Sequence, residues 1–133
     1  MKVKTDTKEK FHAITVETSH LSANMTAGLN AELTKLLQTD IRNIVLKLRD
    51  VNNIDEDAAE ALVKLQQRFY EENASFVVCE LQPQVESFLD KVDILELLNV
   101  TPTESEAWDI VQMEEVEREL LNDSEDWEKE IGS

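Results

Sequence analysis

The sequence predicts a single α/β domain with a mostly parallel, mixed sheet of about four to five strands, helices packed on it, and an acidic C-terminal helical extension. Short apolar runs typical of strands alternate with longer segments of helical periodicity. Glycine and proline are scarce, with two of each, which argues against an all-β fold with many tight turns. A length of 133 residues fits one domain.

The first clear strand covers residues 11–16, because alternate side chains there fall on two faces. Val3 fits a strand before it. Ser22 then suits the N-cap of a first helix that ends near residues 38–40. The apolar residues of this helix recur at helical spacing, and they are Met25, Leu29, Leu33, Leu36 and Leu37.

The apolar run at residues 44–48 predicts an interior strand that stops in the polar stretch 49–53. A second helix follows and closes at residues 71–73, before another buried strand at 75–79. The apolar stripe of this helix consists of Ala58, Ala59, Leu62, Leu65 and Phe69. This alternation of strands and helices indicates parallel strands joined by right-handed crossovers.

Pro83 fits the first turn of a third helix, where its missing N–H costs nothing. The inward residues of that helix are Val85, Phe88, Leu89 and Val92. Residues 99–102 suit a short edge strand or an extended link. Thr103 and Glu106 have the spacing of a capping box and open a last helix. The predicted apolar side of that helix carries Ala107, Ile110, Val111 and Leu121.

The charge of the chain is strongly acidic and uneven. The formal net charge is −16, and residues 104–133 hold 12 acidic residues against two basic ones. We therefore expect a domain over residues 1–121 and a flexible acidic tail over residues 122–133. Such a charge disfavours nucleic acid and anionic membranes as direct partners, and it favours a protein with a basic patch. Simple solvation of exposed helix faces is the alternative explanation of the charge.

The sequence indicates a cytoplasmic protein that does not insert into membranes. The N-terminus lacks the apolar segment of a signal peptide, and no apolar run approaches the roughly 18 residues that span a bilayer. The single cysteine, Cys79, lies in an apolar run without a disulfide partner, so we expect a buried free thiol.

Signals for catalysis are weak, so the sequence predicts no enzyme and no cofactor. The two glycines, Gly28 and Gly132, form no phosphate-binding loop. His12 and His20 have no cysteine or aspartate beside them at metal-binding spacing, and a structural role is expected for each.

One acidic cluster stands at the end of a predicted strand, where sites form in open α/β sheets. It consists of Asp50 and residues 55–57. These carboxylates could bind Mg²⁺, which prefers oxygen ligands. Alternatively they stabilise the start of the second helix, with Asp55 as its N-cap and the negative charges near the positive end of the helix dipole.

The same stretch resembles a known family. Residues 40–55 look like the central strand and loop of STAS domains, especially bacterial anti-sigma factor antagonists, and residues 76–85 and 89–97 resemble the following strand and helix. The resemblance runs from about residue 11 to 121. It implies a STAS-type fold and a protein-binding regulatory module that switches between partners and regulates transcription.

In these antagonists, a serine at the start of the second helix is phosphorylated by a kinase that is also the anti-sigma factor. By this resemblance Asp55 matches the family's aspartate, Glu56 and Asp57 occupy the two serine positions, and Ala58 replaces a glycine. Asp57 therefore stands at the phosphoserine position and cannot be phosphorylated as serine is. It either mimics the phosphorylated state or belongs to a constitutive binding site.

The resemblance implies a partner of the histidine-kinase-like ATPase type, an anti-sigma factor and serine kinase. A transporter permease is the alternative, because STAS domains also serve lipid-transport ABC complexes and anion transporters. The predicted partner-binding residues are Asn52, Asn53, Asp55, Glu56, Asp57, Glu60, Lys64 and Gln67. The sequence leaves open a homodimer, and also whether Trp127 is a docking anchor or part of a solvated tail.

Overall fold

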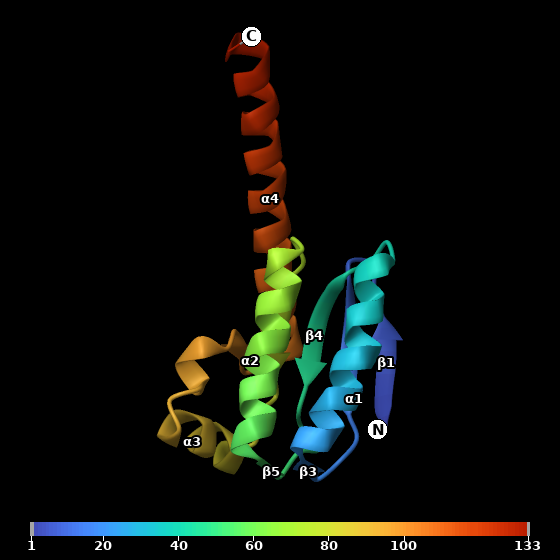
Figure 1. Ribbon diagram of the computed structural model, residues 1–133, viewed down its shortest axis with the longest axis vertical. Helices are drawn as coiled ribbons and strands as arrows, with labels where there is room; N and C mark the ends of the chain where they lie inside the picture. Colours follow the sequence, from blue (N-terminus) through green and yellow to red (C-terminus); the bar gives the residue numbers. More distant parts are fainter. Residues whose placement is uncertain (1, 133) are drawn as a thin grey trace.

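The computed structural model describes residues 2–132, and it describes side chains as far as residue 121 (Figure 1). The elements are β1 (Val3–Thr7), β2 (Phe11–Val16), β3 (His20–Leu21), α1 (Ala23–Thr34), the 3-10 helix η1 (Lys35–Gln38), β4 (Asn43–Lys47), β5 (Asn53–Ile54), α2 (Glu56–Glu71), β6 (Phe76–Cys79), α3 (Pro83–Lys91), the 3-10 helix η2 (Leu95–Leu97), β7 (Val100–Thr101) and α4 (Glu104–Gly132). This order confirms the predicted alternation of strands and helices.

The main sheet has five strands in the order β1-β2-β4-β6-β7. β1 is antiparallel to β2, and all other neighbours are parallel, which confirms the predicted mostly parallel, mixed sheet. The strand predicted around Val3 is β1, and the predicted link 99–102 contains the edge strand β7. A separate parallel pair joins the two-residue strands β3 and β5.

The larger core lies between one face of the sheet and helices α1, α2 and α3. It contains Ile14 from β2, Leu46 from β4 and Val78 from β6, together with the predicted stripe of α2. Phe69 of that stripe packs on Phe76, with ring centroids 5.4 Å apart. Helix α2 ends as predicted, because Asn73 adopts a left-handed backbone (φ 60°) that closes the last turn.

Helix α4 covers the opposite face of the sheet and forms a second, smaller core. Its members are Phe11, Ala13, Val45, Val77, Cys79, Ala107 and Val111. Trp108 packs on Phe11, with ring centroids 5.1 Å apart. The alternation predicted for residues 11–16 is confirmed, since Ile14 and Val16 face the larger core while Phe11 and Ala13 face this one.

Polar contacts fasten α4 along its length. Lys47 lies 2.8 Å from a carboxylate oxygen of Glu104, and this bond raises the pKa of Lys47. The hydroxyl of Tyr70 donates to Glu114 (2.7 Å), and the guanidinium of Arg118 donates to the hydroxyl of Ser75 (2.7 Å). The docked face therefore continues from Glu104 to Arg118, but its last turn is polar.

One predicted apolar position on α4 is wrong. Leu121 was expected on the side of Ala107 and Val111, but its side chain is 64% exposed. At about 100° per residue, Leu121 lies about 40° from Ala107, as Val111 does on the other side, so helical spacing alone places Leu121 near the packed side. The upper part of α4 rises beyond the sheet (Figure 1), and the exposure of Leu121 shows that the docked face of α4 ends before this residue.

The predicted acidic tail lies at the end of α4, which continues to Gly132. The side chains of residues 122–133 lie outside the described part of the chain, so the tail and the role of Trp127 stay predictions. Within residues 2–132, no helix is both long enough and apolar enough to cross a membrane.

The thiol of Cys79 is expected to be unreactive in the folded protein. Burial, helped by the carboxylates of Glu80 and Glu104, raises the pKa of Cys79 to about 12, and only the thiolate is nucleophilic. Titration with Ellman's reagent at pH 8 should give no rapid reaction in native buffer and one equivalent per chain in denaturant. Equal rates in both solutions would contradict the buried position.

The same shift predicts lower stability in alkali. A thiol has a pKa of about 8.5 in an unfolded chain, so between about pH 8.5 and 12 the folded state holds the proton that the unfolded state releases. The contribution of the Cys79 thiol to the free energy of unfolding is therefore complete below about pH 8.5, and it is lost as the pH rises toward 12. Urea unfolding at stepped pH, beside Cys79→Ala, measures this loss.

Candidate functional site

The candidate site lies at the carboxyl ends of the parallel strands. The loop after β4 leaves the sheet there and leads through β5 into α2. The side chains of Val51 and Ile54 are buried in the larger core and anchor this loop to it. The backbone N–H groups of Asn52 and Asn53 both donate to the carbonyl of Ser19, at 2.7 and 3.1 Å. The loop is therefore fixed on both sides before α2 begins.

His20 is a member of this site that sequence spacing did not reveal. Its Nε2 lies 2.9 Å from Oδ1 of Asp55, and its Nδ1 contacts Oδ1 of Asn53. No aspartate stands near His20 in the sequence, so the expectation of a structural histidine did not include this contact with Asp55. The β3–β5 pairing joins residues more than 30 positions apart, and a local motif search does not detect this contact.

Asp55 occupies the N-cap of α2 as predicted, but its side chain makes no capping hydrogen bond. Its carboxylate turns to His20 instead. The negative charges of Glu56 and Asp57 lie in the first turn of α2, next to the positive end of the helix dipole. Both side chains are exposed, and neither forms an ion pair with any residue that the structure describes.

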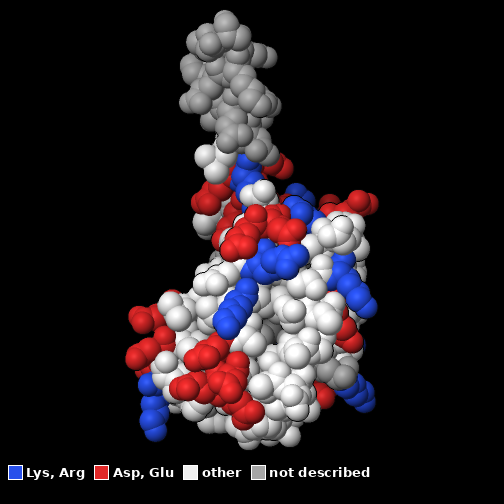
Figure 2. Space-filling view, viewed as in Figure 1, with Lys and Arg blue, Asp and Glu red and all other residues white. Residues whose placement is uncertain are grey.

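The predicted binding residues of α2 form one exposed row. Asp57, Glu60, Lys64 and Gln67 follow each other at intervals of three and four, and all four are exposed. Acidic side chains gather over the lower end of α2, with basic side chains farther up the helix (Figure 2). Asn52 and Asn53 are exposed on the adjoining loop, so all eight predicted residues reach the surface or its margin.

His12, by contrast, is buried and fully engaged. Its Nε2–H donates to the carbonyl of Ile41 (2.8 Å), and its Nδ1 lies 2.9 Å from the hydroxyl of Thr7. These bonds tie β2 to β1 and to the segment before β4. The structural role expected for His12 is confirmed.

Titration of the protein with Mg²⁺ or Mn²⁺ in a calorimeter is expected to give no binding heat. The described residues contain no group of three acidic, histidine or cysteine side chains placed to hold a metal ion. The carboxylate of Asp55 is also already engaged by His20. A saturable heat that disappears in Asp55→Asn would instead restore the magnesium interpretation of the acidic cluster.

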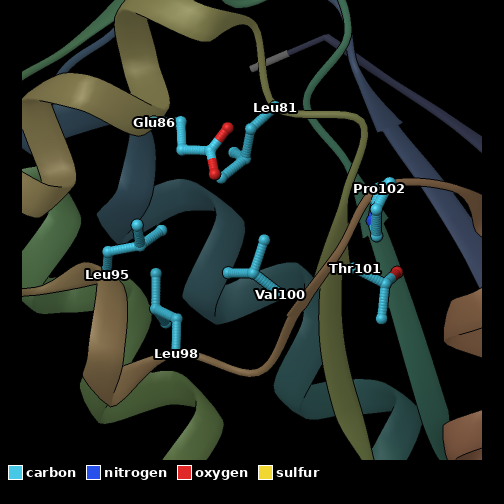
Figure 3. A pocket seen from close by; sticks show the side chains of 7 residues that line it. All are labelled: Leu81, Glu86, Leu95, Leu98, Val100, Thr101 and Pro102. Atoms are coloured by element: carbon cyan, nitrogen blue, oxygen red, sulfur yellow. The ribbon is translucent and has the colours of Figure 1, made fainter.

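A cavity of about 430 Å³ opens at the same end of the sheet, beyond α3 (Figure 3). Most of its lining residues are of apolar type, and they are Leu81, Glu86, Leu95, Leu98, Val100, Thr101 and Pro102. The Thr101 hydroxyl donates to the carbonyl of Thr103, and Glu86 is the charged residue of this lining. None of the predicted site residues lines this cavity.

Comparison with protein-family models gives a match to the family described as STAS domain, over residues 4–107. The matched region starts in β1 and ends in the first turn of α4. It includes the loop after β4 and the whole of α2. A search of curated proteins finds no match.

Solved structures of the same fold include both antagonists and a transporter. A STAS-domain anti-sigma-factor antagonist protein from Planctomyces limnophilus is 18% identical, covers 83% of this chain and 97% of its own, and has a TM-score of 0.70. The Bacillus anti-sigma factor antagonist SpoIIAA, unphosphorylated, is 13% identical, with coverages of 84% and 96% and a TM-score of 0.65. The murine anion transporter Slc26a9 is 15% identical, with coverages of 77% and 18% and a TM-score of 0.64. At these identities the likeness establishes the fold.

Proposed function

The chain belongs to the STAS domain family, and from this premise we propose that it is a regulatory protein-binding module of the anti-sigma factor antagonist kind. Its docking surface consists of the loop after β4 and the exposed row of α2. The partner is an anti-sigma factor with a kinase fold of the histidine-kinase-like ATPase type. The module itself catalyses no reaction, and it acts by occupying or releasing its partner.

The observation that carries this proposal is the position of Asp57. It is exposed in the first turn of α2, at the position where the family resemblance places the phosphoserine. SpoIIAA, which has this fold, has been solved in a phosphorylated and an unphosphorylated form. Phosphorylation adds nearly two negative charges to a serine, whereas an aspartate supplies a carboxylate without the action of a kinase. We infer that binding is independent of phosphorylation.

The engagement of His20 supports a fixed docking surface. With His20 bonded to Asp55 and Asn53, and the loop backbone bonded to Ser19, the row of α2 begins from a well-defined position. A surface ordered before binding loses little conformational entropy on docking. The exposed carboxylates of Glu56, Asp57 and Glu60 require a partner with basic groups facing them.

The test is capture of the tagged protein from its own cells, followed by identification of the bound proteins by mass spectrometry. Recovery of an anti-sigma factor with a kinase fold supports the proposal. An Asp57→Ser version is captured in parallel and assayed with that partner and ATP. Phosphate transfer to the introduced serine of this variant, and none to the wild type, would confirm the role of the position.

A transporter-associated regulator is the second candidate function, because the fold is shared with a segment of an anion transporter. The same capture experiment separates the two. An ABC permease or another transporter, recovered by the wild type and lost with Asp57→Arg, would favour this second function. Recovery of neither class of protein would contradict both.

A further inference from the structure

Helix α4 carries an exposed apolar stripe on the side that faces away from the sheet. Met113, Val116 and Leu120 are 59%, 53% and 60% exposed, and their spacing of three and four places them on one line. Ala107 and Val111, which are completely buried, lie on the opposite side of the helix. The stripe therefore contributes nothing to the packing of α4 on the domain.

The charges around this stripe are acidic. Glu117 and Glu119 are exposed on its two sides, and Asp109, also exposed, continues its line toward the start of α4. Arg118 is the sole basic residue between 104 and 121, and it points inward to donate to Ser75. An apolar line with acidic margins on both sides is thus presented to solvent.

We propose that this stripe is a docking site for a basic amphipathic helix of a partner protein. Such a helix places Leu, Ile or Met side chains at intervals of three and four against Met113, Val116 and Leu120. Its flanking Lys or Arg side chains then meet Asp109, Glu117 and Glu119. Apolar contact supplies the affinity, and the charges select the partner and its orientation.

A second copy of this chain fits the site poorly. Pairing two stripes would bring the acidic margins of two α4 helices together, and each chain already carries a formal net charge of −16. Like charges at a helix–helix seam oppose association. The charge pattern therefore favours a basic partner over self-association.

The stripe is held in a fixed position before any partner binds. Glu104, Glu114 and Arg118 are bonded to the domain, as described above. In addition, Nδ2 of Asn43 donates to the carboxylate of Glu115 at 2.7 Å. These contacts come from β4, from α2 and from Ser75, the residue before β6. The stripe also lies on the face of the sheet opposite α2, so it is separate from the surface that contains Asp57.

The test uses a synthetic peptide of leucine and lysine with one apolar helical face, and a control peptide of the same composition with the leucines dispersed. Binding to the full chain is measured by fluorescence anisotropy at physiological salt. We expect the amphipathic peptide to bind at least tenfold more tightly than the control. Met113→Ser/Val116→Ser/Leu120→Ser should remove this preference, because the acidic margins alone do not distinguish the peptides.

A matched pair of single variants separates the stripe from general apolar contact. Leu120→Ser should weaken binding of the amphipathic peptide several-fold, and Leu121→Ser should not, although Leu121 is 64% exposed. All three side chains of the stripe are exposed, so the triple variant should keep the wild-type thermal unfolding curve. Asp57→Arg should bind the peptide as the wild type does, which keeps this test independent of the proposed antagonist function.

Three results would overturn the proposal. Equal affinity for both peptides would show that charge attraction alone accounts for the binding and that the apolar stripe takes no part. A preference that survives in the triple variant would place the binding elsewhere. A dimer seen by light scattering, dissociated by Leu120→Ser, would assign the stripe to a second copy of the chain.

Discussion

A chain that ends at Thr103 is expected to lose its cooperative fold, although it keeps all seven strands and helices α1, α2 and α3. Removal of α4 uncovers the second face of the sheet, where Phe11, Val45 and Val77 are buried. Burying a side chain of this size stabilises a protein by about 1.5–3 kcal/mol, so exposing these three costs about 5–9 kcal/mol. The whole stability of a domain is typically about 5–15 kcal/mol.

Thermal unfolding followed by circular dichroism is the measurement, with a chain that ends at Leu121 as the matched control. The control retains every described contact of α4, including Arg118 with Ser75, and should unfold within a few degrees of the full chain. The shorter chain should show no sharp transition and should bind an apolar dye. Cooperative unfolding of the chain that ends at Thr103 would show that α4 is an appendage and not a layer of the domain.

Most of the main sheet could be predicted because its signals are local. Residues 44–46 and 76–79 are continuous apolar runs, and strands buried on both faces need such runs. The stripe of α2 repeats at helical intervals, and all its members enter the larger core. The alternation within 11–16 even assigned the correct residues to each face of the sheet.

The place of α4 could not be predicted from its sequence, because its docked face is only half apolar. Ala107 and Val111 mark the apolar half, whereas Glu114, Glu115 and Arg118 continue the contact through polar bonds. Acidic residues on a helix are more often solvated than anchored. Periodicity therefore assigned Leu121 to the packed side and gave no indication of these anchors.

The candidate site was predicted where one continuous segment carries it and missed where two segments meet. The loop after β4 and the row of α2 are adjacent in sequence, so the acidic cluster and the family resemblance both point to them. His20 joins them only through the β3–β5 pair, which is two residues long. Strands of that length have no periodicity to detect.

Reversal of one charge, Asp57→Arg, is expected to weaken binding to the captured partner about 30-fold or more. Opposing a desolvated charge across an interface costs about 2–5 kcal/mol, and about 1.4 kcal/mol corresponds to a tenfold change. Asp57 is exposed and forms no ion pair with a described residue, so the folded chain itself should lose little stability. The dissociation constant is measured by calorimetry, with unfolding curves of both proteins as a check.

The control must separate a local contact from the overall charge. Glu9→Arg changes the net charge by the same amount. Glu9 is exposed in the turn before β2, at the end of the strands opposite the loop after β4. It should alter the affinity by less than threefold, because salt screens charges that lie beyond about 8–10 Å from the interface. If both reversals weaken binding equally, the partner responds to the acidic field of the whole chain and the docking surface is not at α2. If Asp57→Arg alone abolishes binding, the carboxylate at the phosphoserine position belongs to a constitutive contact and does not mimic a released state.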